Sequence, residues 1–245
     1  MLGPVDYGLV LLSVAAELFV VVCLSISKKR LRYLAINIYM LASVGVTIGG
    51  VLALKHFGIT SQGYGYFYYY TDALLTIALF FVVMSFYQQV FHQMGVGNYV
   101  RLASILLLSA TAIFSYLVVR RMPTHHLTNR FVVEMSQNLY FVGVVLTYLL
   151  WGAVVKLRET RTRLIQLVLA LGIFFSSEAA SYALRNLFPS LEANILKWIP
   201  PIANTFLPLA WAYTFTKIPE DARLETARVT HRPPAPAGMA AHQHS

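Results

Sequence analysis

The chain has 245 residues, of which 58% are hydrophobic and only 12% carry a charge. Soluble domains carry about 25% charged residues, so this composition excludes an ordinary soluble protein and favours an integral membrane protein. The formal net charge of +9 does not indicate a nucleic-acid partner. The basic residues stand at the ends of long apolar runs, and no soluble domain remains to hold a nucleic acid.

Seven apolar runs follow one another along the chain, and each is long enough to cross a bilayer as a helix of about 20 residues. The connections between them are too short to hold a second folded domain. We therefore expect an all-α, polytopic membrane protein, with a seven-helix domain over residues 1–217 and a largely disordered tail over residues 218–245. The predicted spans lie near residues 6–26, 33–54, 66–91, 99–119, 130–154, 164–186 and 198–216.

The first run is predicted to remain in the membrane rather than to be cleaved as a signal peptide. The sequence MLGPVDYG at its start has no basic residue, and the basic cluster KKRLR comes after the run. The single cysteine, Cys23, lies inside this run, so an intramolecular disulfide is excluded.

The distribution of Lys and Arg predicts the orientation. With the N-terminus outside, the cytoplasmic side holds 13 of the 19 Lys and Arg residues, many of them in KKRLR and KLRETRTR. Short loops rich in basic residues stay in the cytoplasm, so we expect the C-terminus there and a location in the cytoplasmic (inner) membrane. The sequence RRMP after the fourth run is an exception, because it places two arginines outside.

The third run opens with YGYFYYYTD, residues 64–72, in which aromatic residues cover the whole circumference of a helix. An aromatic belt at the membrane interface explains tyrosines there without a functional role. The alternative is the aromatic wall of a pocket with Asp72 at its base, which would suit a cationic or planar ligand.

The same segment carries a resemblance. Tyr66, Phe67, Tyr68 and Tyr70, continuing through TDALLTIALFFVVMSFYQQVF, resemble an uncharacterised group of bacterial seven-span membrane proteins with a tyrosine-rich start to the third span. The resemblance covers mainly the first four spans. No activity is assigned to that group, so the resemblance implies no functional residue.

Two backbone signals concern helix packing. Gly45 and Gly49 in the second run form a pattern of small residues suited to close contact with another helix. Pro200, Pro201 and Pro208 in the seventh run imply kinks or opened backbone hydrogen bonds.

Four acidic residues lie inside the predicted spans, namely Glu17, Asp72, Glu134 and Glu178. A charge facing lipid costs about 3 kcal/mol or more, so each is expected to face the interior of the bundle. With a rise of about 1.5 Å per residue, all but Glu17 fall in one layer in the outer half of the bilayer. Glu17 is expected nearer the midplane.

Other polar residues stand at helical spacing from these acids. Glu178, Tyr182 and Arg185 share one helix face, and Arg185 is expected to pair with Asp72 or Glu134, because Glu178 is too far along the same helix. A pocket opening outward between spans one, three, five, six and seven would collect these groups, although polar residues also bond helices together without any ligand. The candidate ligand-binding residues are Glu17, Tyr69, Asp72, Glu134, Asn138, Glu178, Tyr182, Arg185 and Asn204.

No catalytic pattern accompanies this pocket. The sequence has no nucleophile–base pair, no cluster with metal-ligand spacing and no lysine in the middle of the seventh run for a retinal Schiff base. We expect no enzyme activity, no cofactor and no bound metal. The favoured function is a receptor-like or ligand-binding membrane protein, and the alternatives are a small solute or proton-coupled transporter and a structural membrane subunit. The expected partners are the lipid bilayer, a small-molecule ligand, and a protein partner or further copies of the chain, but no nucleic acid.

Overall fold

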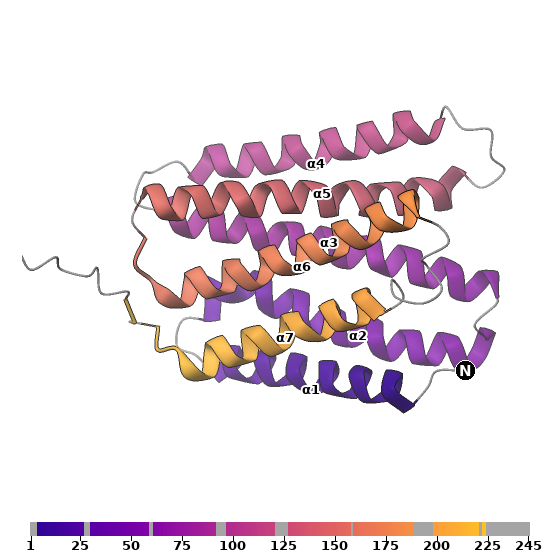
Figure 1. Cartoon of the computed structure of the whole chain (residues 1–245), viewed down its shortest axis with the longest axis horizontal. Coiled ribbons are helices and arrows are strands. Elements are labelled where there is room, and N and C mark those ends of the chain that lie inside the picture. Colours follow the sequence, from indigo (N-terminus) through magenta and orange to yellow (C-terminus); the bar gives the residue numbers. More distant parts are fainter. Residues whose placement is uncertain are drawn as a thin grey trace, which may run out of the picture.

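The computed structural model describes residues 4–26, 30–58, 61–91, 97–120, 127–157, 159–188, 198–220 and 222–223. Within these ranges the chain forms seven α-helices and one short 3₁₀ helix (Figure 1). They are α1 (Pro4–Ile26), η1 (Arg30–Tyr33), α2 (Leu34–Phe57), α3 (Gln62–Phe91), α4 (Gly97–Arg120), α5 (Leu127–Lys156), α6 (Thr162–Leu187) and α7 (Ile199–Lys217). The predicted all-α fold is confirmed, and each predicted apolar run overlaps one helix.

Six of these helices form a closed ring. Packing contacts join α1 to α2, α2 to α3, α3 to α5, α5 to α6, α6 to α7, and α7 back to α1. The fourth helix, α4, packs against α5 and α3 outside this ring, and Figure 1 shows it at the outer edge of the bundle. Trp211, Phe80 and Phe86 are among the most deeply buried side chains of the core between the ring helices.

The surface of the bundle is apolar. Six of the described helices, α1 to α6, are long and apolar enough to cross a membrane. Large apolar side chains are exposed on every helix, for example Leu11, Phe81 and Ile173, and an apolar surface of this extent is compatible with an integral membrane protein. The seventh helix is not among the six, because three prolines and Asn204 lower its hydropathy. A seventh crossing and the orientation of the termini therefore stay predictions.

The prolines of α7 differ in their effect. The predicted kink or opened backbone hydrogen bond was wrong for Pro200 and Pro201. Both lie in the first turn of α7, where a missing N–H removes no helical hydrogen bond. Pro208 lies inside the helix, and its missing N–H frees the carbonyl oxygen of Asn204 four residues earlier. Ser13 Oγ of α1 donates to that oxygen over 3.3 Å, so a side chain of α1 supplies the hydrogen bond that α7 lacks.

Two glycines allow close helix packing. A Cβ on Gly143 of α5 would overlap the ring of Phe175 of α6, and a Cβ on Gly49 of α2 would lie 2.9 Å from the ring of Phe67 of α3. The predicted close contact is thus present at Gly49. It is absent at Gly45, where a Cβ would have no neighbouring atom within 4 Å.

The chain after α7 packs against the connection between α5 and α6. The Thr162 N–H donates to the carbonyl oxygen of Ala222 over 3.1 Å, and Arg163 Nε donates to that of Ile218 over 2.9 Å. The beginning of the segment predicted as a disordered tail therefore makes defined contacts. Residues 224–245, on which most of that prediction rests, lie outside the described residues.

Candidate functional site

A cavity of about 430 Å³ lies in the half of the bundle where α1, α3 and α7 begin and where α2 and α6 end. We call it the central cavity. Four of the candidate residues line it, namely Glu17, Asp72, Arg185 and Asn204. Further polar and aromatic side chains complete its wall: Ser13, Tyr39, Ser43, Thr47, Tyr68, Thr71, Tyr140 and Thr205.

Glu17 is fixed by serines from its own helix and from α2. Ser43 Oγ donates to Glu17 Oε1 over 2.7 Å, and Ser13 Oγ reaches the same oxygen over 3.3 Å. The Glu17 side chain is only 4% exposed, and its second oxygen, Oε2, is buried with no hydrogen-bond partner among the described residues. One oxygen therefore holds the carboxyl group in place, while the other has hydrogen-bonding capacity left.

Asp72 of α3 is held by two phenol groups. Tyr140 of α5 donates to Asp72 Oδ1 over 3.1 Å, and Tyr182 of α6 donates to Oδ2 over 3.4 Å. The two tyrosine rings stack on each other, with ring centroids 5.6 Å apart. This arrangement joins three helices around one carboxyl group, and it explains why the inward faces of α5 and α6 both carry a tyrosine at this level.

Glu178 and Arg185, both on α6, lie close to Asp72. Glu178 is 5% exposed, and its Oε1, like Nε of Arg185, is buried with no hydrogen-bond partner in the described part of the chain. Glu178 interacts electrostatically with both Asp72 and Arg185. The direct ion pair predicted between Arg185 and Asp72 or Glu134 is not among the contacts of the described residues. Glu134 does not form this pair because its position on α5 lies outside the central cavity, whereas Arg185 lines it.

The structure places three candidate residues elsewhere. Tyr69 and Glu134 line a separate groove of about 480 Å³ between α3, α4, α5 and α6. Asn138 Nδ2 donates to Ser115 Oγ of α4 over 2.9 Å, which is a contact that holds α4 on the ring. Glu178 and Tyr182 do not line the central cavity but adjoin it through Asp72.

Sequence reasoning missed Tyr140 and Ser43, which make the shortest contacts to Asp72 and Glu17. For Tyr140 a signal was present. Ser136, Tyr140 and Thr147 recur at helical spacing and are all at most 5% exposed, which marks them as the inward face of α5. For Ser43 no such signal existed, because a lone serine in an apolar helix is common.

The central cavity contains carboxyl, phenol, hydroxyl and guanidinium groups, which suit binding by hydrogen bonds and charge. Within the described part of the chain, no group of three or more His, Cys, Asp or Glu is placed to hold a metal ion. The chain matches no protein-family model, no curated protein and no solved structure.

Proposed function

We propose that the protein is a seven-span membrane protein of the receptor-like or ligand-binding type, with its N-terminus outside and its C-terminus in the cytoplasm. In this orientation the central cavity lies in the outer half of the membrane. Its ligand is a small molecule that carries a cationic amine. A cavity of about 430 Å³ falls within the range of small-molecule sites, about 300–1,000 Å³.

The observation that carries this proposal is a set of buried polar atoms, in or next to the central cavity, for which the described residues offer no hydrogen-bond partner. Glu17 Oε2 and Arg185 Nε belong to residues that line the cavity, and Glu178 Oε1 belongs to a residue that adjoins it through Asp72. Leaving a buried polar group unpaired costs about 1–3 kcal/mol, and native proteins rarely keep several together without a ligand or water to bind. A polar ligand in the cavity would recover part of that cost.

The chemistry of the wall supports an amine. Glu17 and Asp72 both line the central cavity, and carboxylates form strong charge-assisted hydrogen bonds with ammonium groups. The rings of Tyr39, Tyr68 and Tyr140 beside them favour a cation through their π faces. Arg185 also lines the cavity and offers an additional contact for a carboxylate, so an amine that also carries an acid group would use charges of both signs.

The test is thermal unfolding of the purified protein in lipid nanodiscs against a panel of amines, amino acids, sugars and aromatic compounds. A ligand at about 100 times its Kd stabilises the folded state by about 2.7 kcal/mol. We expect an amine to raise the melting temperature of the wild type, and we expect Glu17→Gln and Asp72→Asn to lose this response. Glu134→Gln is the matched control, because Glu134 lies outside the cavity, and it should respond as the wild type does. The proposal fails if no amine stabilises the wild type, or if the control loses the response too.

A transporter is the second candidate, favoured by Pro208 inside α7, which frees the carbonyl oxygen of Asn204, a residue that lines the cavity. In transporters, substrate sites are often formed where a membrane helix lacks part of its backbone hydrogen bonding. Amine uptake into proteoliposomes, abolished by Glu178→Gln, would favour transport. Binding without uptake would favour the receptor-like function.

A further inference from the structure

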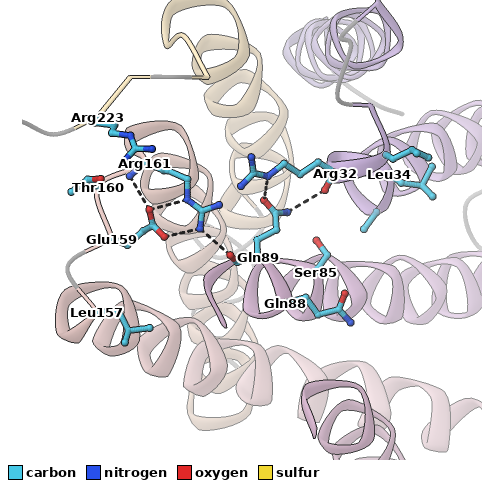
Figure 2. Close-up of a pocket in the computed structure, with 12 residues that line it drawn as sticks. Arg32, Leu34, Ser85, Gln88, Gln89, Leu157, Glu159, Thr160, Arg161 and Arg223 are labelled. Atoms are coloured by element: carbon cyan, nitrogen blue, oxygen red, sulfur yellow. Dashed lines mark hydrogen bonds and ion pairs between the residues drawn. The ribbon is translucent and has the colours of Figure 1, made fainter. Parts of the chain in front are cut away.

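A second and larger cavity lies at the opposite end of the bundle. Its volume is about 840 Å³. Four segments meet around it, namely the start of α2 with η1, the end of α3, the connection between α5 and α6, and the segment after α7. Its polar lining includes Arg32, Ser85, Gln88, Gln89, Arg161 and Arg223 (Figure 2). We call it the arginine cavity.

Two of its arginines are held in fixed positions on either side of Gln89 (Figure 2). Arg32 Nε donates to Gln89 Oε1 over 3.0 Å, and Gln89 Nε2 donates back to the carbonyl oxygen of Arg32 over 3.1 Å. Arg161 Nη2 donates to the carbonyl oxygen of Gln89 over 2.9 Å. Glu159 holds the same guanidinium through Nε at 2.8 Å and Nη2 at 2.6 Å. The arginines are thus ordered before any ligand binds.

Donors remain free after these bonds are made. Arg32 also uses Nη1, in an ion pair with Glu220 at 3.2 Å. Among the described residues, no partner is then found for Nη2 of Arg32, for Nη1 of Arg161 or for the exposed guanidinium of Arg223. Ser85 Oγ, on the α3 wall, is buried without a partner.

The charge of this cavity is positive. Three arginines and one glutamate line it, which gives +2, and the ion pair of Arg32 with Glu220 lowers this to +1. Leu31, Leu34 and Leu157 supply an apolar part of the lining, so an anion with an attached apolar portion also fits.

We propose that the arginine cavity binds a phosphate-bearing anion, either the headgroup of an anionic lipid or a free phosphate compound. Guanidinium groups bind phosphate through paired N–H donors, and basic pockets between membrane helices hold anionic headgroups. The proposal is independent of the function of the central cavity, because the two cavities share no lining residue.

The test measures thermal unfolding in nanodiscs of neutral phosphatidylcholine at constant ionic strength. One arm titrates inorganic pyrophosphate, and the other replaces a tenth of the lipid with phosphatidylglycerol. Stabilisation by pyrophosphate identifies a free phosphate compound as the ligand class, and stabilisation by phosphatidylglycerol alone identifies a lipid headgroup. In the arm that responds, Arg223→Gln should weaken the effective affinity by about tenfold or more, as expected for the loss of one charge-assisted hydrogen bond.

Arg101→Gln is the matched control. It removes one positive charge from the exposed start of α4, at the same end of the bundle but outside the cavity, and it should leave the response unchanged. The proposal is overturned if neither arm stabilises the wild type, or if Arg101→Gln weakens the response as much as Arg223→Gln does.

Discussion

Glu17 connects three helices through two serines. Ser43 on α2 donates to its Oε1, and Ser13 on α1 lies between this oxygen and the carbonyl oxygen of Asn204 on α7. A hydroxyl has a single hydrogen, so Ser13 shares its donor between two acceptors. The bond from Ser43, at 2.7 Å, is therefore the main support of the buried carboxyl group.

We predict that Ser43→Ala destabilises the fold by about 1–2 kcal/mol, because the largely buried carboxyl group of Glu17 loses its shortest hydrogen bond. The measurement is the melting temperature in nanodiscs. Ser181→Ala is the control, since Ser181 is also buried but its hydroxyl has no partner. An equal loss in both variants would show that cavity formation, rather than the bond to Glu17, causes the effect.

Glu159, in the connection between α5 and α6, gives a prediction on pH. The hydrogen bond from the Arg161 side chain lowers the pKa of Glu159 from its ordinary value of 4.5. A carboxyl group with a lowered pKa stabilises the folded state fully above its unfolded pKa, and this contribution is lost as the pH falls through the folded pKa.

Glu159→Gln should therefore lower the stability at pH 7 by at most about 1 kcal/mol, since the ion pair is partly exposed. The difference from the wild type should disappear as the pH falls below 4.5 towards 3. Melting curves of both proteins across this range measure it. A difference that stays constant with pH would mean that the charge of Glu159 does not stabilise the fold.

At the scale of the helices, the contact between α5 and α6 sets the geometry of the site. Gly143 lets the Phe175 ring pack directly against the backbone of α5. The same ring lies 6.2 Å from that of Tyr140, centroid to centroid, and Tyr140 binds Asp72. Close packing of two helices and the position of a cavity residue thus depend on the same glycine.

We predict that Gly143→Ala destabilises the protein by about 1–3 kcal/mol, because a new methyl group overlaps a fully buried ring. Gly152→Ala, on the same helix, should be neutral or slightly stabilising. A Cβ there meets no atom within 4 Å, and alanine favours a helix over glycine. Melting temperatures of both variants in nanodiscs test this, and equal values would contradict the packing argument.

On the scale of the whole molecule, two polar cavities lie at opposite ends of the ring of helices, and α4 packs on one side of the ring. The arrangement separates a mixed acidic and aromatic cavity from a basic one. In the proposed orientation the first faces outward and the second faces the cytoplasm, where anionic lipids attract basic groups.

The sequence allowed the helices to be predicted because seven long apolar runs are separated by short polar segments. It could not give the rotation of each helix or the neighbours of each helix. Tyr68 rather than Tyr69 lines the central cavity, and Glu134 lies in a different groove from Asp72. The positions of Tyr68 and Glu134 depend on which helices pack together: α3 contacts α5, and α4 packs outside the ring. Asp72 and Glu17 were identified because an acid inside an apolar run needs an interior environment.

In the proposed orientation, the central cavity opens to the outside of the cell and the arginine cavity opens to the cytoplasm. The most direct measurement is labelling of single cysteines with a membrane-impermeant thiol reagent in a Cys23→Ala background. Thr71→Cys reports on the central cavity and Gln88→Cys on the arginine cavity. We predict that intact cells label Thr71→Cys, and that Gln88→Cys reacts only when the cytoplasmic face is exposed in inverted vesicles. Reversed accessibility, or labelling of both from the same side, would contradict the proposed orientation.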